Sequence, residues 1–226
     1  MAYLGHLTHS LHGYLKPPEN IDIALFTGDM SNPRDLLQST NECRDFIEWY
    51  SSLNILHKVA ISGNHDVSIE KRLVTPADFT SKGITYLENS YTTILGLKIF
   101  GTPFTPIFGI GWAFNKDRGK MHKIWDQVDP DTDIILSHGP PKGIMDLTEN
   151  RDGALEQCGD MNLRTQLRSR LKPKLVAFGH IHCFKNYNNA GILKLSDSDI
   201  IFSNGAVVED GKFSQGPINN GNIITL

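Results

Sequence analysis

The chain lacks the features of disulfide-rich and membrane-spanning proteins. Its three cysteines, Cys43, Cys158 and Cys183, are odd in number and far apart, which argues against a disulfide framework and suits a reducing compartment. No apolar run approaches the ~18 residues of a membrane span, and Met1 is not followed by the basic segment and apolar core of a signal peptide. The sequence therefore predicts a cytoplasmic protein with no membrane partner.

An excess of basic charge is also lacking. The formal net charge is −3 over 226 residues, which argues against general nucleic-acid binding. A local basic run over residues 164–174 fits a solvated helix face. Apolar residues make up 39% and charged residues 21%, as in ordinary globular proteins. The length predicts a single domain, residues 1–226, with a substantial core.

The first third of the chain alternates between strand and helix patterns. Residues 21–26 and 57–61 are apolar runs typical of buried strands. Between them, apolar residues recur at helical spacing over residues 36–53, with Asn32 as the expected N-cap and Pro33 at the expected first helical position. Strand, helix and strand in this order predict a partly parallel sheet.

The remaining sequence predicts shorter strands, with helices over residues 162–171 and within 115–125. Gly96 suits a hairpin turn. The strand patterns lie at 85–87, 91–95, 98–101, 133–136 and 175–178, and those at 192–195, 200–203 and 223–226 are typical of antiparallel strands. We expect an α/β fold in which two mixed β-sheets pack together and helices flank them.

Four polar motifs each directly follow a predicted strand. In open α/β sheets, ligands bind where the carboxyl ends of strands meet, and Asp, Asn and His suit hard or borderline divalent metals. Each motif alone has a structural explanation, such as a turn or a packed histidine, so the two-metal site that we predict depends on their occurrence together. The motifs are Thr27-Gly28-Asp29, Gly63-Asn64-His65-Asp66, Ser137-His138-Gly139 and Gly179-His180-Ile181-His182.

The residue types within these motifs indicate hydrolysis of a phosphate ester. Two divalent ions ~3.5–4 Å apart can hold a hydroxide and two phosphate oxygens. Asn64 offers a neutral ligand oxygen, and His65 can donate a proton if the neighbouring carboxylate of Asp66 orients it. The predicted reaction is in-line attack of hydroxide on phosphorus, with His65 protonating the leaving oxygen.

The order of these motifs resembles the calcineurin-like metallophosphoesterase family. The family pattern is Asp-x-His, Gly-Asp, Gly-Asn-His-(Asp/Glu), a lone His and Gly-His-x-His. This resemblance implies a four-layer sandwich. A further resemblance, to the MPPED-type (UPF0046-like) branch, rests on residues 112–115, 118–119, 138–141, 172–175 and 203–206.

The resemblance also implies roles for individual residues and a substrate class. The branch is associated with hydrolysis of phosphodiesters, including cyclic nucleotides, so a small nucleotide is the expected substrate. Manganese is the usual metal, with Fe, Zn, Mg, Ni and Co as alternatives. The implied roles are Asp29 as the bridge between two metals, His9 and His182 on the first metal, Asn64, His138 and His180 on the second, His65 as general acid with Asp66 as its partner, and Asn64, His65, Gly139 and Pro140 around the substrate.

The first family motif is incomplete in this chain. Its best match is His6-Leu7-Thr8-His9-Ser10, where Leu7 stands in place of the usual Asp. A second register, over residues 10–13, puts Ser10 in that place and also lacks a carboxylate. We therefore expect weaker binding of the first metal. The alternatives are a mononuclear site, or a nucleotide-binding or sequestering protein on a degenerate phosphoesterase scaffold with little turnover.

Overall fold

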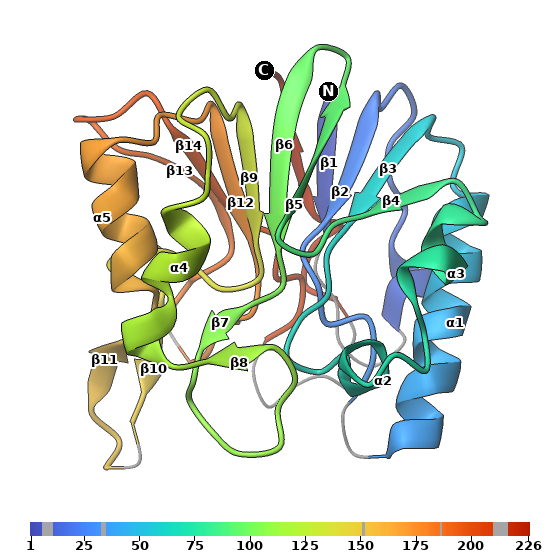
Figure 1. The fold of residues 1–226 in the computed structure, drawn as a ribbon, viewed down its shortest axis with the longest axis horizontal. Coiled ribbons are helices and arrows are strands. Elements are labelled where there is room, and N and C mark those ends of the chain that lie inside the picture. Colours follow the sequence, from blue (N-terminus) through green and yellow to red (C-terminus); the bar gives the residue numbers. More distant parts are fainter. Residues whose placement is uncertain (6–10, 33–34, 151, 186, 210–216) are drawn as a thin grey trace.

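The computed structural model describes residues 1–5, 11–32, 35–150, 152–185, 187–209 and 217–226. Two mixed sheets pack face to face with helices on their outer sides, which confirms the expected α/β sandwich (Figure 1). The first sheet has the order β15-β1-β2-β3-β4. Its strands are β1 (Ala2–Gly5), β2 (Ile23–Phe26), β3 (His57–Ala60), β4 (Ile84–Tyr86) and β15 (Asn222–Ile224).

The second sheet has the order β13-β14-β12-β9-β6-β5. Its four central strands are parallel, and β5 and β13 pair antiparallel at the two edges. The expectation of an antiparallel strand near residues 200–203 is therefore only half right, because β14 is antiparallel to β13 but parallel to β12. The strands are β5 (Ser90–Ile94), β6 (Leu97–Thr102), β9 (Ile134–Ser137), β12 (Leu175–Phe178), β13 (Gly191–Lys194) and β14 (Ile201–Asn204).

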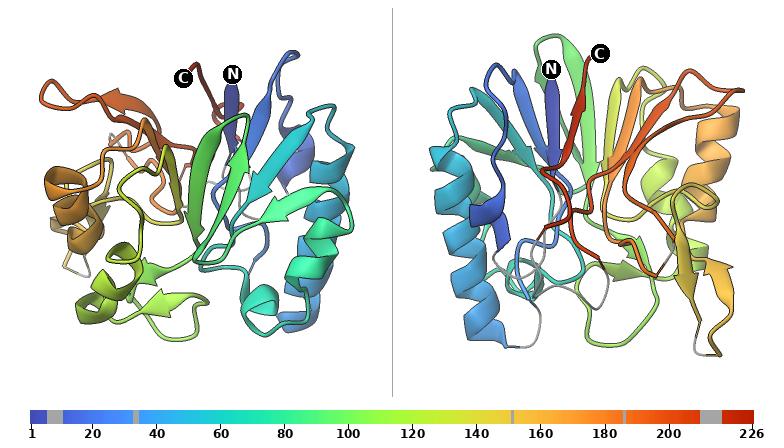
Figure 2. Two further views of the ribbon diagram at one scale, coloured as in Figure 1. Left: turned by 45° about the horizontal axis from the view of Figure 1, so that its top comes forward. Right: turned by 180° about the vertical axis from the view of Figure 1, so that it is seen from behind.

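In the first sheet, β1 to β4 run parallel, and β15 pairs antiparallel with β1. Figure 2 shows β1 and β15 side by side, with the two chain ends close together. The strands confirm the partly parallel sheet predicted from the first third of the sequence. None of the helices in the described part of the chain combines the length and apolar character that a membrane crossing requires.

Alternating side chains of the central strands build three apolar layers. In β2, Ile23 and Leu25 belong to the core between the two sheets, whereas Ala24 and Phe26 face the helices. In β9, Ile134 and Leu136 face the first sheet, and Ile135 faces the opposite helices. Strands buried on both faces have nearly continuous apolar sequences, which is why these runs were recognisable in the sequence.

Two short helices and one long helix cover the outer face of the first sheet and its loops. They are α1 (Leu36–Ser52), α2 (Val67–Glu70) and α3 (Pro76–Thr80). In α1, Phe46 and Tyr50 pack on Phe26, with ring centroids 4.3 and 6.0 Å away. The predicted N-cap, Asn32, is wrong, because the side chain of Asp35 accepts the backbone N–H of Gln38 (2.7 Å) at the start of α1. Pro33 lies outside the described residues.

The outer face of the second sheet is covered by α4 (His122–Trp125) and α5 (Met161–Ser169). The segment of residues 115–125 contains the predicted helix, α4, in its last four residues. Its first part forms β8 (Asn115–Lys116), paired with β7 (Thr105–Pro106), and a 3-10 turn, η2 (Arg118–Lys120). Phe114, immediately before β8, has a positive φ of 50°, which is not a helical conformation.

Turns and a second hairpin complete the fold. Leu95 and Gly96 have φ of 51° and 79° in the turn between β5 and β6, and two positive φ values are what a type I′ hairpin requires. The predicted turn at Gly96 is therefore confirmed. A further hairpin joins β10 (Leu147–Glu149) and β11 (Leu155–Gln157), and η1 (Leu11–Tyr14) precedes β2.

Candidate metal centre

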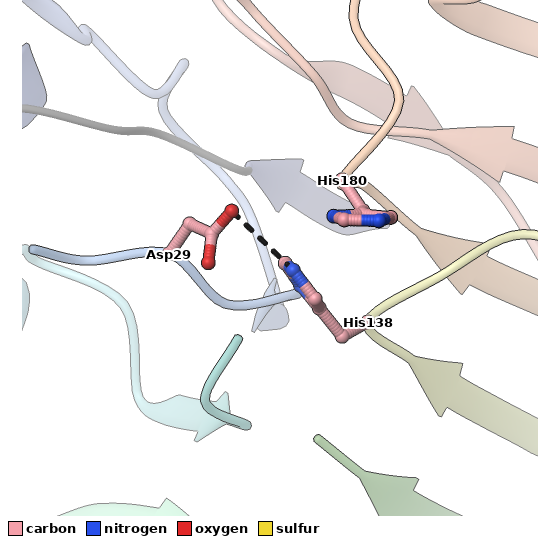
Figure 3. A group of neighbouring side chains, drawn as sticks. All are labelled: Asp29, His138 and His180. Carbon is pink, nitrogen blue, oxygen red and sulfur yellow. Dashed lines mark ion pairs between the residues drawn. The ribbon is translucent and has the colours of Figure 1, made fainter. Parts of the chain in front are cut away.

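The predicted ligands meet at the carboxyl ends of strands from both sheets. Asp29 follows β2 and Asn64 follows β3 in the first sheet, whereas His138 follows β9 and His180 follows β12 in the second. Figure 3 shows Asp29, His138 and His180 gathered in one place. The side chains predicted to lie at separate strand ends are therefore brought together at one place.

The distances within this group suit a metal site. The Nε2 atom of His138 lies 3.3 Å from Oδ2 of Asp29 and 2.8 Å from Oδ1 of Asn64. The ring centroids of His138 and His180 are 4.9 Å apart. One ligand atom each from Asp29, His138 and His180 lies within 4.8 Å of the others. Asp29, Asn64 and His138 are buried, and His180 is half-buried.

The hydrogen bonding of His138 tests whether these residues fit a cation. Its Nδ1 lies 2.8 Å from the carbonyl oxygen of Thr27, which can only accept, so Nδ1 carries a proton. In the neutral ring, the lone pair of Nε2 then points toward the oxygens of Asp29 and Asn64. A proton on Nε2, or a cation held by the three groups, would compensate the buried carboxylate of Asp29. A backbone carbonyl that fixes the tautomer of a ligating histidine is a common feature of metal sites.

The pKa values of the two histidines differ because their charged neighbours differ. Burial alone would lower the pKa of His138, but the carboxylate of Asp29 and the hydrogen bonds of the ring raise it above its usual value. Burial, with a further contribution from His138, lowers the pKa of His180 well below its usual value. His180 is therefore neutral at physiological pH, which a metal ligand requires.

Glycine is required where the two ligand loops of the first sheet touch. A Cβ at Gly63 would lie 2.3 Å from both Oδ1 of Asp29 and Cε1 of His138. Gly28, at φ 99°, would bring a Cβ within 2.6 Å of the backbone of Ser62. Asp29 has a positive φ of 61°, a conformation that aspartate tolerates better than most residues. Close approach of these loops thus places Asp29 beside Asn64.

Asp66 holds the loops of Asp29 and Gly63 together through hydrogen bonds to their backbone. Its carboxylate accepts the backbone N–H groups of Gly63 (2.7 Å), Asp29 (3.0 Å) and Ser31 (3.0 Å), and the hydroxyl of Ser31 (3.1 Å). These four bonds use the acceptor positions of both oxygens. The carboxylate was expected to turn toward the neighbouring ring, but the folded loops present backbone amides to it instead.

A buried hydroxyl chain connects Asp66 to helix α1, and the sequence analysis did not identify it. The Oγ atom of Ser31 lies 2.9 Å from that of Ser39. The hydroxyl of Ser39 donates to Ser68 (3.1 Å), which donates to the thiol of Cys43 (3.3 Å). All four side chains are buried. The sequence feature that could have indicated this chain of hydroxyls is Ser39, a polar residue on the apolar face of the predicted helix.

His65 lies at the edge of the cluster. Its backbone N–H donates to Oδ1 of Asp29 (2.8 Å), and its Nε2 lies 4.0 Å from Oδ2 of the same carboxylate. Its ring packs against Trp112 with a centroid distance of 4.9 Å. Burial lowers the pKa of His65, and the carboxylate of Asp29 partly offsets this effect. The side chain is 18% exposed, so a substrate can reach it.

Of the residues expected on the first metal, Asp29 and His182 belong to the described part of the chain. His182 is half-buried and lies outside the group formed by Asp29, His138 and His180. Its Nδ1 is 3.1 Å from the carbonyl oxygen of Val208. The carbonyl of His182 accepts a hydrogen bond from the amide of Asn189 (2.9 Å). His9, Leu7 and Ser10 lie outside the described residues.

A cavity of about 420 Å³ opens beside His180. Gly139 and Pro140, expected near the substrate, line it, together with Phe108 and Arg118. The hairpin of β10 and β11 forms another wall through Thr148 and Glu156. This volume lies within the ~300–1,000 Å³ of typical small-molecule sites.

Comparison with known proteins agrees with this site. The model of the family described as calcineurin-like phosphoesterase matches residues 4–184. Metallophosphoesterase domain-containing protein 1 of Homo sapiens and of Mus musculus are each 28% identical to the chain over 198 residues, which cover 77% of the chain and 58% of each relative. A UPF0046 protein of Caenorhabditis elegans is 31% identical over 194 residues, which cover 77% of the chain and 66% of that relative.

The chain therefore spans about three fifths of the length of these curated relatives. The predicted resemblance to the MPPED-type and UPF0046-like branch is confirmed, because the matched relatives carry those names. The family match covers the four strand-end motifs, up to and including His180 and His182. The chain belongs to the calcineurin-like phosphoesterase family, a family of dinuclear metal-dependent phosphoesterases.

Proposed function

We propose that the protein is a metal-dependent phosphodiesterase that hydrolyses a small nucleotide, including cyclic nucleotides. The observation that carries this proposal is the convergence of Asp29, Asn64 and His138, whose acceptor atoms face one another beside His65. Family membership supports a metal-dependent phosphoesterase. The phosphodiester and the nucleotide are the more specific parts of the proposal.

Two divalent ions would occupy the site, with manganese as the preferred metal. Asp29, Asn64, His138 and His180 would hold one ion, and Asp29 would share the other with His182 and His9. When bound, the ions lower the pKa of water and neutralise charge on the phosphoryl group. The oxygen and imidazole donors of these residues suit manganese and also iron, zinc, nickel and cobalt.

His65 would act as the general acid. Its imidazole lies at the edge of the cluster and is partly exposed, so it can reach the oxygen that leaves phosphorus. An anionic phosphate beside the ring favours the protonated imidazole and offsets the effect of burial on the pKa of His65. Asp66 contributes by fixing the loops of Asp29 and Gly63, which positions the ligands for the reaction.

Aromatic side chains near the site support a nucleotide as the substrate. Phe108 is 45% exposed and lies with its ring centroid 5.1 Å from that of His180. Trp112 packs between Phe108 and His65, with centroid distances of 5.6 and 4.9 Å. Exposed aromatic faces can stack on a nucleobase. Gly139 and Pro140 would stiffen the neighbouring wall of the substrate site.

The test is manganese-dependent hydrolysis of a panel of 2′,3′- and 3′,5′-cyclic nucleotides by the purified protein. We expect turnover that the double variant Asn64→Ala, His65→Ala loses, and that a chelator abolishes. His122→Gln is the matched control, since His122 is an exposed histidine on α4. No turnover of any cyclic nucleotide, or equal turnover in the double variant, would contradict the proposal.

The second candidate is a nucleotide-sequestering protein, and the sequence at Leu7 favours it. The usual carboxylate of the first motif is replaced by an apolar side chain, which removes an anionic metal ligand. Equilibrium dialysis with cyclic nucleotides separates the two functions. Tight binding without turnover at saturating manganese supports sequestration, whereas turnover supports the enzyme.

A further inference from the structure

The cavity beside His180, which we name the hairpin cavity, lies on one side of the metal cluster. Its near wall is formed by His180, Gly139 and Pro140, and its far wall by Thr148 and Glu156 of the β10–β11 hairpin. The lining does not include His65 or Trp112 among the described residues. The expected general acid therefore lies outside the lining of the hairpin cavity.

A series of ring contacts connects His65 with the hairpin cavity. The order is His65, Trp112, Phe108 and His180, with successive ring centroids 4.9, 5.6 and 5.1 Å apart. His65 is the first ring of this series, and the last two, Phe108 and His180, line the hairpin cavity. Asp29 lies 4.0 Å from the Nε2 of His65 and within the ligand group of His180.

This arrangement distinguishes the two substituents of a phosphodiester. Water supplies the new oxygen on phosphorus, the opposite P–O bond breaks, and His65 gives its proton to the leaving oxygen, then regains a proton from water. The leaving alcohol must therefore lie near His65. The other substituent stays on phosphorus and becomes part of the phosphomonoester product; in a cyclic nucleotide it is the ribose oxygen whose bond to phosphorus is kept.

We propose that the hairpin cavity binds the substituent that stays on phosphorus and selects a neutral group of nucleoside size. This inference rests on the proposed phosphodiesterase function and deepens it. His180 belongs to the ligand group and also lines the cavity, next to Gly139 and Pro140. One substituent of a phosphate bound at the ligand group can therefore extend into the cavity. Phe108 offers an aromatic face at the entrance.

The charges of the cavity wall favour a neutral substituent. Arg118 donates from both terminal nitrogens to the carbonyl of Cys158 (3.3 Å each), which fixes its position. The carboxylate of Glu149 pairs with Lys185, and Glu156 adds a negative charge that has no ion-pair partner among the described residues. Arg118 and Glu156 bring one charge of each sign to the lining of the cavity. The lining therefore has no net positive charge with which to bind a second phosphate group of the substrate. Glu156 can instead accept a hydrogen bond from the N–H of a nucleobase.

The test compares two substrates with the same leaving group. Thymidine 5′-(p-nitrophenyl phosphate) and methyl p-nitrophenyl phosphate both release p-nitrophenol, but only the first leaves a nucleoside on phosphorus. We expect wild-type kcat/KM to be about tenfold higher or more for the thymidine ester, the lower end of what pocket contacts contribute to discrimination. The products should be thymidine 5′-phosphate and p-nitrophenol in equal amounts.

Two cavity variants and one matched control complete the test. Thr148→Trp fills the hairpin cavity, and Glu156→Gln removes its unpaired charge without changing its shape. Both should lower the preference for the thymidine ester, and Thr148→Trp should abolish it. Thr92→Trp, at another half-buried threonine in an edge strand, should keep the wild-type preference.

The outcomes separate this inference from the proposed function. Hydrolysis of both esters with equal kcat/KM, or an unchanged preference in both cavity variants, would overturn the inference and leave the phosphodiesterase standing. Failure of the wild-type protein to hydrolyse either ester would overturn both. A reduced preference in Glu156→Gln alone still supports the inference if Thr148→Trp does not fold.

Discussion

The Nε2 atom of His138 lies 2.8 Å from the side-chain oxygen of Asn64, although 73 residues separate them in the chain and they follow strands of different sheets. Because Nδ1 of His138 bonds to the Thr27 carbonyl, the contact places two acceptors face to face when the ring is neutral. A cation held by these groups would relieve that repulsion, so we expect the metal affinity of the site to depend on this pair.

We predict that His138→Gln lowers manganese affinity on the order of 100-fold, because it removes an imidazole ligand and its fixed tautomer. Isothermal titration calorimetry on the metal-free protein measures the change. His57→Gln, at a half-buried histidine at the start of β3, is the control and should bind manganese like the wild type. Equal affinity in His138→Gln and the control would show that His138 is not a ligand.

Ser31→Ala should lower kcat about tenfold, in the range seen when a partner of a metal-site residue is removed. The variant takes one donor from Asp66 and breaks the hydroxyl chain to Ser39. Steady-state kinetics at saturating manganese measure the effect, and Ser31→Thr should restore the rate because it keeps the hydroxyl. Ser51→Ala, at the exposed end of α1, controls for loss of a hydroxyl. A lower melting temperature with unchanged kcat would mean that Ser31 is purely structural.

Asp133→Asn should destabilise the protein at pH 7 by about 1 kcal/mol, a typical contribution of one hydrogen bond. The Asp133 carboxylate accepts the backbone N–H of Lys98 (2.9 Å) and pairs with Lys174 (3.0 Å), and these contacts lower its pKa. A lowered folded-state pKa contributes stability above the unfolded pKa of 3.8 and loses it as pH falls through the folded value.

The free energy of unfolding, measured by urea denaturation from pH 7 to pH 2, checks this prediction. The difference between wild type and Asp133→Asn should be constant near neutrality and shrink below about pH 4. Asp131→Asn is the control, because Asp131 is 75% exposed and pairs with Lys98 at the surface. A difference that grows as pH falls would contradict the assignment.

Leu7→Asp should strengthen binding of the first metal and raise the rate at limiting manganese. The substitution restores the carboxylate that the family has at this place in the first motif, whereas Leu7 offers no ligand atom. Leu7→Asn separates the effect of charge from that of shape. Equal metal affinity and equal rates for wild type and Leu7→Asp would refute the register that aligns residues 6–10 with the family motif.

The sequence predicted that Asp29, Asn64, His138 and His180 would lie close together, because each follows a strand with a strong apolar pattern. The strands β2, β3, β9 and β12 are buried on both faces, so their ends could be located, and parallel pairing brings those ends to one edge. The helix start was wrong because Asn32 and Asp35 are both good caps by residue type, and only the fold decides between them.

The role of Asp66 could not be predicted from its place beside His65. Its partners are backbone amides from two loops, and their positions depend on the glycines at residues 28 and 63. The hairpin cavity was equally hidden, since its walls come from segments around residues 108, 118, 140 and 156. These segments are brought together by tertiary contacts, which the local sequence pattern does not predict.

The ligand group draws Asp29 and Asn64 from one sheet and His138 and His180 from the other. An ion held by all four is therefore a cross-link between two sheets that otherwise meet through apolar side chains. Departure of that ion requires the loops of at least one sheet to draw back. The rate of manganese exchange should then follow the local opening of this edge, and a bound ion should slow hydrogen exchange at the ends of β2 and β9 together.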